Sequence, residues 1–323
     1  MLVTCDDFSA LRQTVAHLRR QTMREGIEVV LVCPSLDRLA LDETTLAGFA
    51  GWRIVQIGRI PAIATAYAHG IRAASAPVVA LGEDHSFPDP NWAEALLRSH
   101  GEPYAAVGPL VCNANPFNSI SWADMLLGYG PWLNPDGGGV CNHLPGHNSS
   151  YKRDVLLEYG ERLDEMLEAE TVLHWDLRRR GYVLFHDASA RTRHTNFALL
   201  KPWTVAQFCT GRCFAASRAT SWSIAKRALY AAASPLIPIV RFRRLLSHAW
   251  QCRETRPRLL WLLPAMIYAV VIDGIGQLVG YSLGAGGAKE QLRELEFRRD
   301  RFILPDDRRR LFDDAIAAAI HAG

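Results

Sequence analysis

The sequence predicts an α/β protein in which a doubly wound sheet is followed by a helical, membrane-facing C-terminal extension. Three observations support this fold class. Apolar strand-like runs alternate with helical patterns over the first hundred residues, polar clusters stand where those runs end, and the composition changes near residue 223. Strands that alternate with helices are typical of a parallel sheet with helices on both faces.

Length and composition exclude several classes of protein. The 323 residues suffice for about two domains of roughly 150 residues each. Hydrophobic residues make up 49% and charged residues 21%, which excludes a largely disordered chain. The net charge of +3 indicates no nucleic-acid partner. The seven cysteines are scattered without a CxxC pair, so we expect a reducing compartment and no disulfide scaffold. The first residues do not resemble a signal peptide.

The first predicted elements are short strands and amphipathic helices. Residues 2–4 form a short strand, and Ser9 is placed to cap a helix with apolar residues at helical spacing. Residues 28–33 are an uninterrupted apolar run, as in a buried parallel strand. The elements expected next are strands at residues 52–57 and 77–82, with an alanine-rich helix between them at residues 61–74.

Polar clusters follow three of these predicted strands, and ligands of doubly wound sheets bind at the carboxyl ends of strands. The clusters are Asp6-Asp7, Cys33-Pro34-Ser35 and Glu83-Asp84-His85. The third is the strongest local signal, because carboxylate and imidazole groups together can hold a divalent cation whose shell is completed by phosphates. The alternative is an ordinary polar turn after a strand.

The middle of the chain mixes all three kinds of structure. The expected elements are strands at residues 105–108, 182–185 and 188–193, helices at residues 152–156 and 164–180, and a glycine-rich loop at residues 134–139. Residues 146–150 form a small polar loop that either lines an acceptor pocket or caps a helix.

Acidic and basic side chains in this middle part offer further chemistry. Glu170 lies in the first turn of a predicted helix, where it could act as a general base toward a hydroxyl group. Simple helix-start chemistry is the alternative. His194 ends a predicted strand and could complete a metal shell, while Arg191 and Arg193 could face a phosphate, unless they are plain surface residues.

The last hundred residues are predicted to contact a membrane. Uncharged runs of 13 and 14 residues occupy residues 228–240 and 259–272. Eight basic residues and one acid lie between residues 226 and 258, which favours an interfacial segment facing acidic lipids. The runs are short for a spanning helix, which needs about 20 residues. A span through the second run and a buried helical bundle remain the alternatives.

Taken together, these segments resemble a family-2 glycosyltransferase with the GT-A fold, the Rossmann-like nucleotide-diphospho-sugar transferase sheet. The order of motifs matches over residues 1–215, and the family's DxD motif, which precedes a proline and a tryptophan-led helix, corresponds to Glu83-Asp84-His85. The matching segments are residues 3–20, 28–32, 61–70, 73–77, 83–85, 88–97 and 170–182.

The resemblance implies a metal, Mn²⁺ or Mg²⁺, bound with a nucleotide-sugar diphosphate. By position, Glu83 and His85 take the outer places of the motif, with Asp84 between them facing metal and donor. A histidine therefore replaces the family's last aspartate. The family's acceptor base falls on Glu170, and Thr171 stands where a second acid is usual, so Glu168 is a rival base.

The resemblance also implies a division of the chain and a set of partners. Residues 1–115 are the nucleotide-sugar half, residues 116–222 the acceptor half, and residues 223–323 the membrane-associated region. Cys33-Pro34-Ser35 stands where the family carries a nucleobase-contacting carboxylate, so Asp37 or Asp6 is expected to substitute for it, and Asp7 is a further candidate for binding the donor.

The expected activity is inverting transfer of a sugar from a UDP- or GDP-sugar to a lipid-linked or polysaccharide acceptor. The expected location is the cytoplasmic face of a bacterial inner membrane, peripheral or monotopic. Two other functions stay open: a nucleotidyltransferase on a related sheet, which releases pyrophosphate, and a catalytically lapsed glycosyltransferase that acts as a membrane assembly partner.

Overall fold

The computed structural model describes residues 1–168 and 170–313, and these divide into two compact units. An α/β unit contains Met1–Cys112 and Asn134–His194, together with the described residues after Arg309. A helical unit contains Asn113–Leu133 and Thr195–Arg309. The helical unit therefore begins earlier than the predicted boundary at residue 222, and it takes a segment from the predicted nucleotide-sugar and acceptor halves.

A small parallel sheet opens the α/β unit. It runs in the order β1 (Leu2–Val3), β2 (Glu28–Cys33), β3 (Gly51–Gln56). Strand β2 pairs in parallel with both neighbours, with Leu2 opposite Leu31 and Glu28 opposite Gly51. Its interior residues are buried, because helices cover both faces of such a sheet.

A larger sheet contains the remaining strands. Its members are β4 (Val78–Ala80), β5 (Ser86–Pro88), β6 (Tyr104–Asn113), β7 (Gly139–Cys141), β8 (Ser150–Lys152) and β9 (Val183–His194). The order is β4-β8-β6-β9-β5, and β7 also pairs with β9. The pairs β4–β8 and β5–β9 are antiparallel.

The prediction of one doubly wound sheet was therefore correct only for the first three strands. The strand expected at residues 77–82 pairs antiparallel with β8, a partner far along the chain. Backbone hydrogen bonds still connect the two sheets: the Met1 ammonium donates to the Ala80 carbonyl at 2.7 Å, and the Gly82 amide donates to the Met1 carbonyl at 2.8 Å.

The helices of this unit are mostly short. They are α1 (Arg12–Arg19), α2 (Leu36–Leu39), α3 (Ile63–Ala73), α4 (Trp92–His100), α6 (Arg153–Leu157), α7 (Leu163–Glu168) and α8 (Glu170–Arg179). The expected capping by Ser9 is wrong. Asp7 caps a short 3₁₀ turn at Phe8–Ala10 by accepting a hydrogen bond from the Ser9 amide, and α1 begins after that turn.

The region predicted as a helix at residues 164–180 and two strands after it is arranged differently. The structure has two helices, α7 and α8, and one continuous strand, β9. Side chains of β9 alternate between faces, so Thr192 and His194 are buried whereas Arg191 and Arg193 are exposed.

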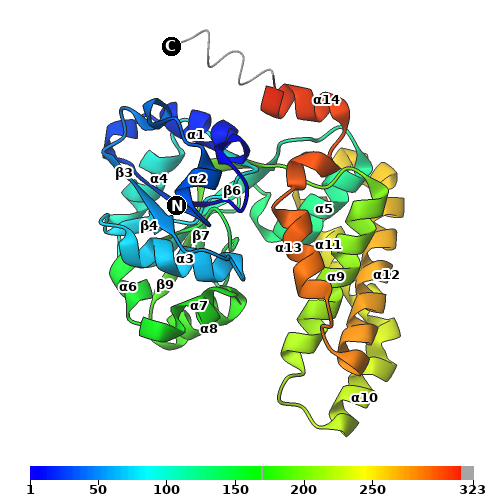
Figure 1. Ribbon diagram of the computed structural model, residues 1–323. Coiled ribbons are helices and arrows are strands. Elements are labelled where there is room, and N and C mark those ends of the chain that lie inside the picture. Colours follow the sequence, from blue (N-terminus) through cyan, green and yellow to red (C-terminus); the bar gives the residue numbers. More distant parts are fainter. Residues whose placement is uncertain (169, 314–323) are drawn as a thin grey trace. The chain divides into compact units, whose positions relative to one another are not determined.

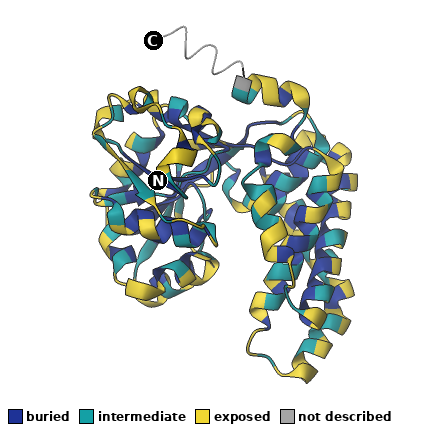
Figure 2. Cartoon of the chain, in the orientation of Figure 1, coloured by how far each residue is buried: buried dark blue, intermediate teal, exposed yellow. Residues whose placement is uncertain are grey.

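The longest helices of the helical unit are α9, α11 and α12 (Figure 1). Its helices are α5 (Ser119–Tyr129), α9 (Leu200–Arg218), α10 (Ile224–Ala233), α11 (Ile237–Gln251), α12 (Leu259–Leu283), α13 (Ala288–Glu296) and α14 (Pro305–Arg308). Helices α9 and α12 lie side by side, and their buried residues face the interior of the bundle (Figure 2).

Glycines allow α9 and α12 to approach closely. A Cβ on Gly276 would lie 2.2 Å from the Phe208 carbonyl oxygen, and one on Gly280 would lie 2.4 Å from that of Arg212. On the opposite helix, a Cβ on Gly211 would lie 2.3 Å from the Asp273 carbonyl oxygen. Small residues at such positions let helix backbones pack almost in contact.

Helix α12 is longer than the predicted apolar run because Asp273 does not interrupt it. The Asp273 carboxylate is fully buried, accepts hydrogen bonds from Arg241 and Gln277, and is thereby compensated inside the helical unit. In the described part of the chain, Arg256–Leu283 is the one helical stretch whose length and mean hydropathy of 1.9 would suffice to cross a membrane. Within its most apolar window, 39% is buried by the protein itself.

A buried carboxylate ties α5 into the helical unit. Asp124 accepts hydrogen bonds from the Trp203 indole and the Arg299 guanidinium, both at 3.0 Å. It also accepts one from the Phe197 amide at 3.0 Å. Since each of these donors lies far along the chain, α5 gains its partners only after the middle of the protein has been built.

Candidate functional site

Two segments of the larger sheet bring a carboxylate and two imidazoles together. Glu83 and His85 lie on the connection between β4 and β5, and His194 is the last residue of β9. Strands β5 and β9 pair antiparallel with Ser86 opposite His194, which places the neighbouring His85 beside it. One potential ligand atom from each of the three residues lies within 4.8 Å of the others, so we call Glu83, His85 and His194 the metal group.

Neighbouring residues hold the metal group in place. The Thr14 hydroxyl of α1 lies 3.0 Å from the Glu83 carbonyl oxygen and 3.1 Å from that of Asp84. The Asp84 carboxylate lies 2.5 Å from Nδ1 of His85. Asp84 therefore faces the far side of the His85 ring and does not join the ligand atoms of the group.

The loop at residues 146–148 connects the metal group with Glu170. Asn148 Nδ2 donates a hydrogen bond to Glu83 Oε2 at 3.0 Å. The His147 imidazole stands between the two carboxylates, with Nδ1 3.8 Å from Glu83 Oε1 and Nε2 3.6 Å from Glu170 Oε1. Glu83 and Glu170 are thus joined through one side chain.

The two carboxyls have opposite electrostatic environments. Burial raises the pKa of a carboxyl, but at Glu83 the three nearby histidines and the Asn148 hydrogen bond outweigh burial and lower the pKa to about 2. At Glu170 burial prevails over the attraction of His147, and the charge of Glu83 adds to it, so the Glu170 pKa is raised. Glu83 is therefore suited to bind a cation as an anion, whereas Glu170 is the more basic of the two carboxylates.

The structure does not bring the predicted phosphate-binding arginines to the metal group. Arg191 and Arg193 lie on the exposed face of β9, opposite to the face of His194, because side chains alternate along a strand. Arg193 Nε instead donates to Asp89 Oδ1 at 2.9 Å, and Arg191 contacts the Cys112 sulfur at 3.9 Å.

The remaining predicted residues are not members of the metal group. Asp6 is half-buried after β1, Asp7 is exposed and caps a turn, and Asp37 is exposed on α2. Glu168 is exposed at the end of α7, whereas Glu170, at the start of α8, is half-buried beside His147.

The alternative that the loop at residues 146–150 caps a helix is wrong. The loop leads into β8, and α6 begins at Arg153 without a capping side chain. His147 and Tyr67 were missed as site residues by sequence reasoning. Tyr67 lies on α3, donates to the Gly82 carbonyl at 2.8 Å, and places its ring 6.0 Å from that of His147.

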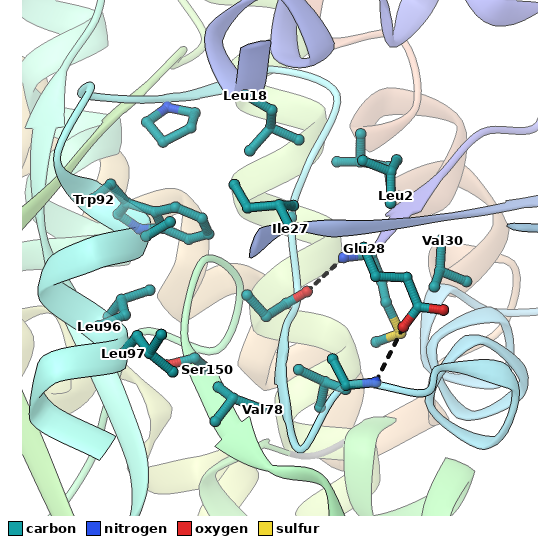
Figure 3. A pocket seen from close by; sticks show the side chains of 18 of the residues that line it. Leu2, Leu18, Ile27, Glu28, Val30, Val78, Trp92, Leu96, Leu97 and Ser150 are labelled. Carbon is teal, nitrogen blue, oxygen red and sulfur yellow. Dashed lines mark hydrogen bonds between the residues drawn. The ribbon is translucent and has the colours of Figure 1, made fainter. Parts of the chain in front are cut away.

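The α/β unit also contains an apolar cavity of about 290 Å³ (Figure 3). Aliphatic side chains such as Val30, Val78 and Leu96 surround it, together with Trp92. Among the described side chains that line it, Glu28 alone is charged, and that carboxylate accepts hydrogen bonds from the Ser75 and Ala76 amides. A diphosphate requires cations or many donors, so this cavity does not suit one.

The donor set of the metal group fits a divalent transition metal. One carboxylate and two imidazoles offer one oxygen and two nitrogens, whereas Mg²⁺ is bound through oxygen. The Asp84–His85 contact is the arrangement that commonly orients a ligating histidine.

Comparisons with known proteins give structural neighbours only. A scan of protein-family models finds no match, and a search of curated proteins also finds none. Among solved structures, GalNAc-T7 with UDP, GalNAc and Mn²⁺ is similar at 13% identity and a TM-score of 0.44. That match covers 60% of this chain and 43% of the other, so the chain spans less than half the length of GalNAc-T7.

Two further structures match with lower scores. The mannosyltransferase PcManGT from Pyrobaculum calidifontis, in complex with GDP-Man and Mn²⁺, has 14% identity and a TM-score of 0.39 over 99% of this chain and 84% of its own. A mycobacterial protein has 14% identity and a TM-score of 0.36 over 60% of this chain and 63% of its own.

Proposed function

We propose that the α/β unit is the catalytic part of a family-2 glycosyltransferase that moves a sugar from a nucleotide-sugar to a hydroxyl group. One observation carries the proposal: the metal-group carboxylate Glu83 and the carboxylate Glu170 both lie within 4 Å of the same imidazole, His147. Such a transfer needs a cation beside the diphosphate and a base beside the acceptor hydroxyl, and this pair offers both.

The metal group would hold the cation. Glu83, His85 and His194 are the ligands in this proposal, and their mixed oxygen and nitrogen donors favour Mn²⁺ over Mg²⁺. A bound metal ion neutralises charge on a diphosphate leaving group. Asp84 orients the His85 ring through Nδ1 and leaves Nε2 to face the cation.

Glu170 would act as the general base. Burial raises its pKa, which strengthens it as a proton acceptor compared with an ordinary glutamate. The Glu170 carboxylate takes the proton of the acceptor hydroxyl while that oxygen attacks the anomeric carbon of the sugar. The bond from this carbon to the diphosphate oxygen breaks and the nucleoside diphosphate leaves, so a single displacement inverts the anomeric centre. The donor in this proposal is a UDP- or GDP-sugar, and Asp6, half-buried after β1, is a candidate for contacting its nucleoside.

Binding of nucleotides with metal tests the metal group directly. UDP and GDP, each with Mn²⁺ or Mg²⁺, should raise the unfolding temperature and should bind in titration calorimetry. Replacement of Glu83 and His85 together by alanine should abolish the metal-dependent part of that affinity. An unchanged affinity in this double variant would remove the metal group from the proposal.

Product analysis separates the alternatives. Release of a nucleoside diphosphate from the donor supports sugar transfer, whereas release of pyrophosphate indicates a nucleotidyltransferase. Metal-dependent binding of nucleotide-sugars without any turnover across a panel of donors and acceptors would indicate a lapsed enzyme.

We also propose that the helical unit docks on the cytoplasmic face of a bacterial inner membrane, where a lipid-linked or polysaccharide acceptor is available. The basic segment of residues 226–258 supports this location, and so do apolar side chains exposed within it. Leu229, Ile239 and Trp250 are 65%, 60% and 55% exposed. Apolar residues among basic ones are typical of surfaces that enter the headgroup region.

Vesicle binding tests this location. The protein should sediment with anionic vesicles and not with neutral ones, and 1 M salt should release it because the Debye length falls to about 3 Å. Arg243→Gln with Arg244→Gln should weaken binding, at about 1 kcal/mol for each charge. Arg19→Gln with Arg20→Gln, an exposed pair on the α/β unit, is the matched control. Equal loss in both variants, or no sedimentation at low salt, would contradict the proposal.

A further inference from the structure

Gly146 lies directly against the carboxylate of Glu170. A Cβ built on Gly146 would be 1.7 Å from Glu170 Oε2 and 1.9 Å from its Cδ. The backbone of Gly146 is not in the left-handed region. The absence of a side chain at this position therefore matters for space and not for conformation, because any other residue would push the Glu170 carboxylate away.

Asn148 holds the other carboxylate. Its φ of 69° lies in the left-handed region, which asparagine tolerates better than most residues. The backbone amide of Asn148 donates to the Leu81 carbonyl at 2.6 Å, and its buried side-chain amide donates to the Glu83 carboxylate at 3.0 Å. The unusual backbone conformation thus points the Asn148 side chain at the metal group.

His147 fills the space between the two carboxylates. Its ring nitrogens lie 3.8 Å from Glu83 and 3.6 Å from Glu170, which are ion-pair distances and too long for direct hydrogen bonds. Tyr67 supports the ring from α3, and the Tyr67 hydroxyl is itself tied to Gly82, the residue before Glu83. Gly146 therefore lies against Glu170, Asn148 bonds to Glu83, and His147 lies close to both carboxylates.

We propose that residues 146–148 form a carboxylate clamp, a positioning segment that sets the separation of Glu83 and Glu170. Asn148 holds the Glu83 carboxylate by a hydrogen bond, and Gly146 leaves room for the Glu170 carboxylate. His147 lies between these two carboxylates and keeps them apart. The proposal rests on the proposed function, since the separation matters because a donor bound at Glu83 must meet a hydroxyl activated at Glu170. The clamp residues act through the carboxylates and are positioning residues.

A double-mutant cycle on unfolding tests the clamp without any substrate. Gly146→Ala should lower the unfolding temperature by only about 1–2 °C, because the added methyl group meets the far end of the Glu170 side chain, which can move away. In a Glu170→Ala background the same change should cost almost nothing, since the clashing carboxylate is gone. Gly51→Ala, where a Cβ meets nothing within 4 Å, is the matched control. Equal losses in both backgrounds would overturn the contact.

Steady-state kinetics distinguish positioning of the base from lining of a pocket. With UDP- and GDP-sugars as donors, Gly146→Ala should lower kcat by about 100-fold, because a displacement of about 1 Å can cost that much. The donor KM should stay within about threefold. Glu170→Asp should relieve the clash, so Gly146→Ala should cost little more in that background. A raised KM with unchanged kcat would overturn positioning and indicate that the loop only lines a pocket.

Binding of Mn²⁺ with UDP or GDP separates the two ends of the clamp. Asn148→Ala should weaken this binding by about 10-fold, as the loss of an outer-shell partner does, whereas Gly146→Ala should leave it unchanged. Wild-type protein that binds no metal would contradict the proposed function, while the unfolding cycle would still decide the clamp. Equal metal affinities in wild type and Asn148→Ala would overturn the role of Asn148.

Discussion

Asp84 and His85 are neighbours in the chain whose side chains also bond to each other: an Asp84 carboxylate oxygen lies 2.5 Å from His85 Nδ1. This contact leaves Nε2 as the atom of the ring that faces Glu83, at 3.9 Å. A carboxylate behind a histidine fixes the orientation of the ring and increases its basicity toward a metal. Asp84, the middle residue of the Glu83-Asp84-His85 cluster, therefore orients the imidazole of the next residue.

Replacement of Asp84 by asparagine should weaken Mn²⁺ binding by about 10- to 100-fold, because asparagine keeps the size of the side chain and loses its charge. Titration of the protein with Mn²⁺, followed by electron paramagnetic resonance, measures the change. Asp154→Asn on α6 is the matched control. Full affinity in Asp84→Asn would show that the carboxylate does not support the His85 ring.

Glu170→Gln should lower turnover by about 10²- to 10⁴-fold while donor binding persists, because glutamine keeps the shape and cannot accept the proton. Glu168→Gln is the matched control, since that residue is exposed at the end of α7. Because the Glu170 pKa is raised, the acid limb of the rate profile should lie above that of an ordinary glutamate. Near-normal turnover in Glu170→Gln, together with a loss of turnover in Glu168→Gln, would show that Glu168 is the general base.

His100 should make the stability of the fold depend on pH. Burial lowers its pKa to about 4, against about 6.5 in the unfolded chain, and Nε2 lies 2.9 Å from the Ser150 hydroxyl. The unfolded state takes up the proton first, so stability is complete above about pH 6.5 and falls as the pH drops toward 4. The slope from this residue is at most about 1.4 kcal/mol per pH unit.

His100→Gln should therefore give a shallower fall of the unfolding temperature between pH 6.5 and 4. Glutamine can keep a hydrogen bond to Ser150 and does not titrate. His69→Gln, at an exposed position on α3, serves as the comparison. If both variants follow the wild-type slope, His100 does not contribute to it.

Gly280→Ala should destabilise the helical unit by about 1–3 kcal/mol, because its Cβ would lie 2.4 Å from the Arg212 carbonyl oxygen and 2.8 Å from the Ala215 Cβ. Denaturant unfolding measures this change. Gly128→Ala on α5, where a Cβ meets nothing within 4 Å, should instead stabilise by up to about 1 kcal/mol. Changes of the same sign in the two variants would contradict the close α9–α12 contact.

The sequence pattern correctly predicted an element whose formation depends on a short apolar run, namely β2. The run at residues 28–33 became β2 with the same bounds, because a continuous apolar segment stopped by proline has few other solutions. The strand-end argument also led to Glu83, His85 and His194, which the β5–β9 pairing brings together. The binding of a metal by these three residues stays a prediction.

Pairing between distant segments could not be predicted. The antiparallel partner of β4 is β8, and nothing in the local sequence of either strand names the other. His147 was missed for a similar reason: it lies in a loop without periodicity, and its contacts with Glu83 and Glu170 come from three separate segments. The alternation of side chains between the two faces of β9 follows from any strand assignment, and it places His194 and Arg193 on opposite faces.

The interrupted path of the chain through the helical unit has a consequence for synthesis. On the ribosome, α5 emerges before β7, β8 and β9, and its packing partners α9 and α12 emerge only after them. During that interval Trp122, Met125 and Leu126, all buried in the finished protein, have no helix to cover them. Nascent chains with exposed apolar surface are prone to aggregate. Truncation before α9 would make this exposure permanent, so a fragment that ends there should aggregate more readily than the full chain.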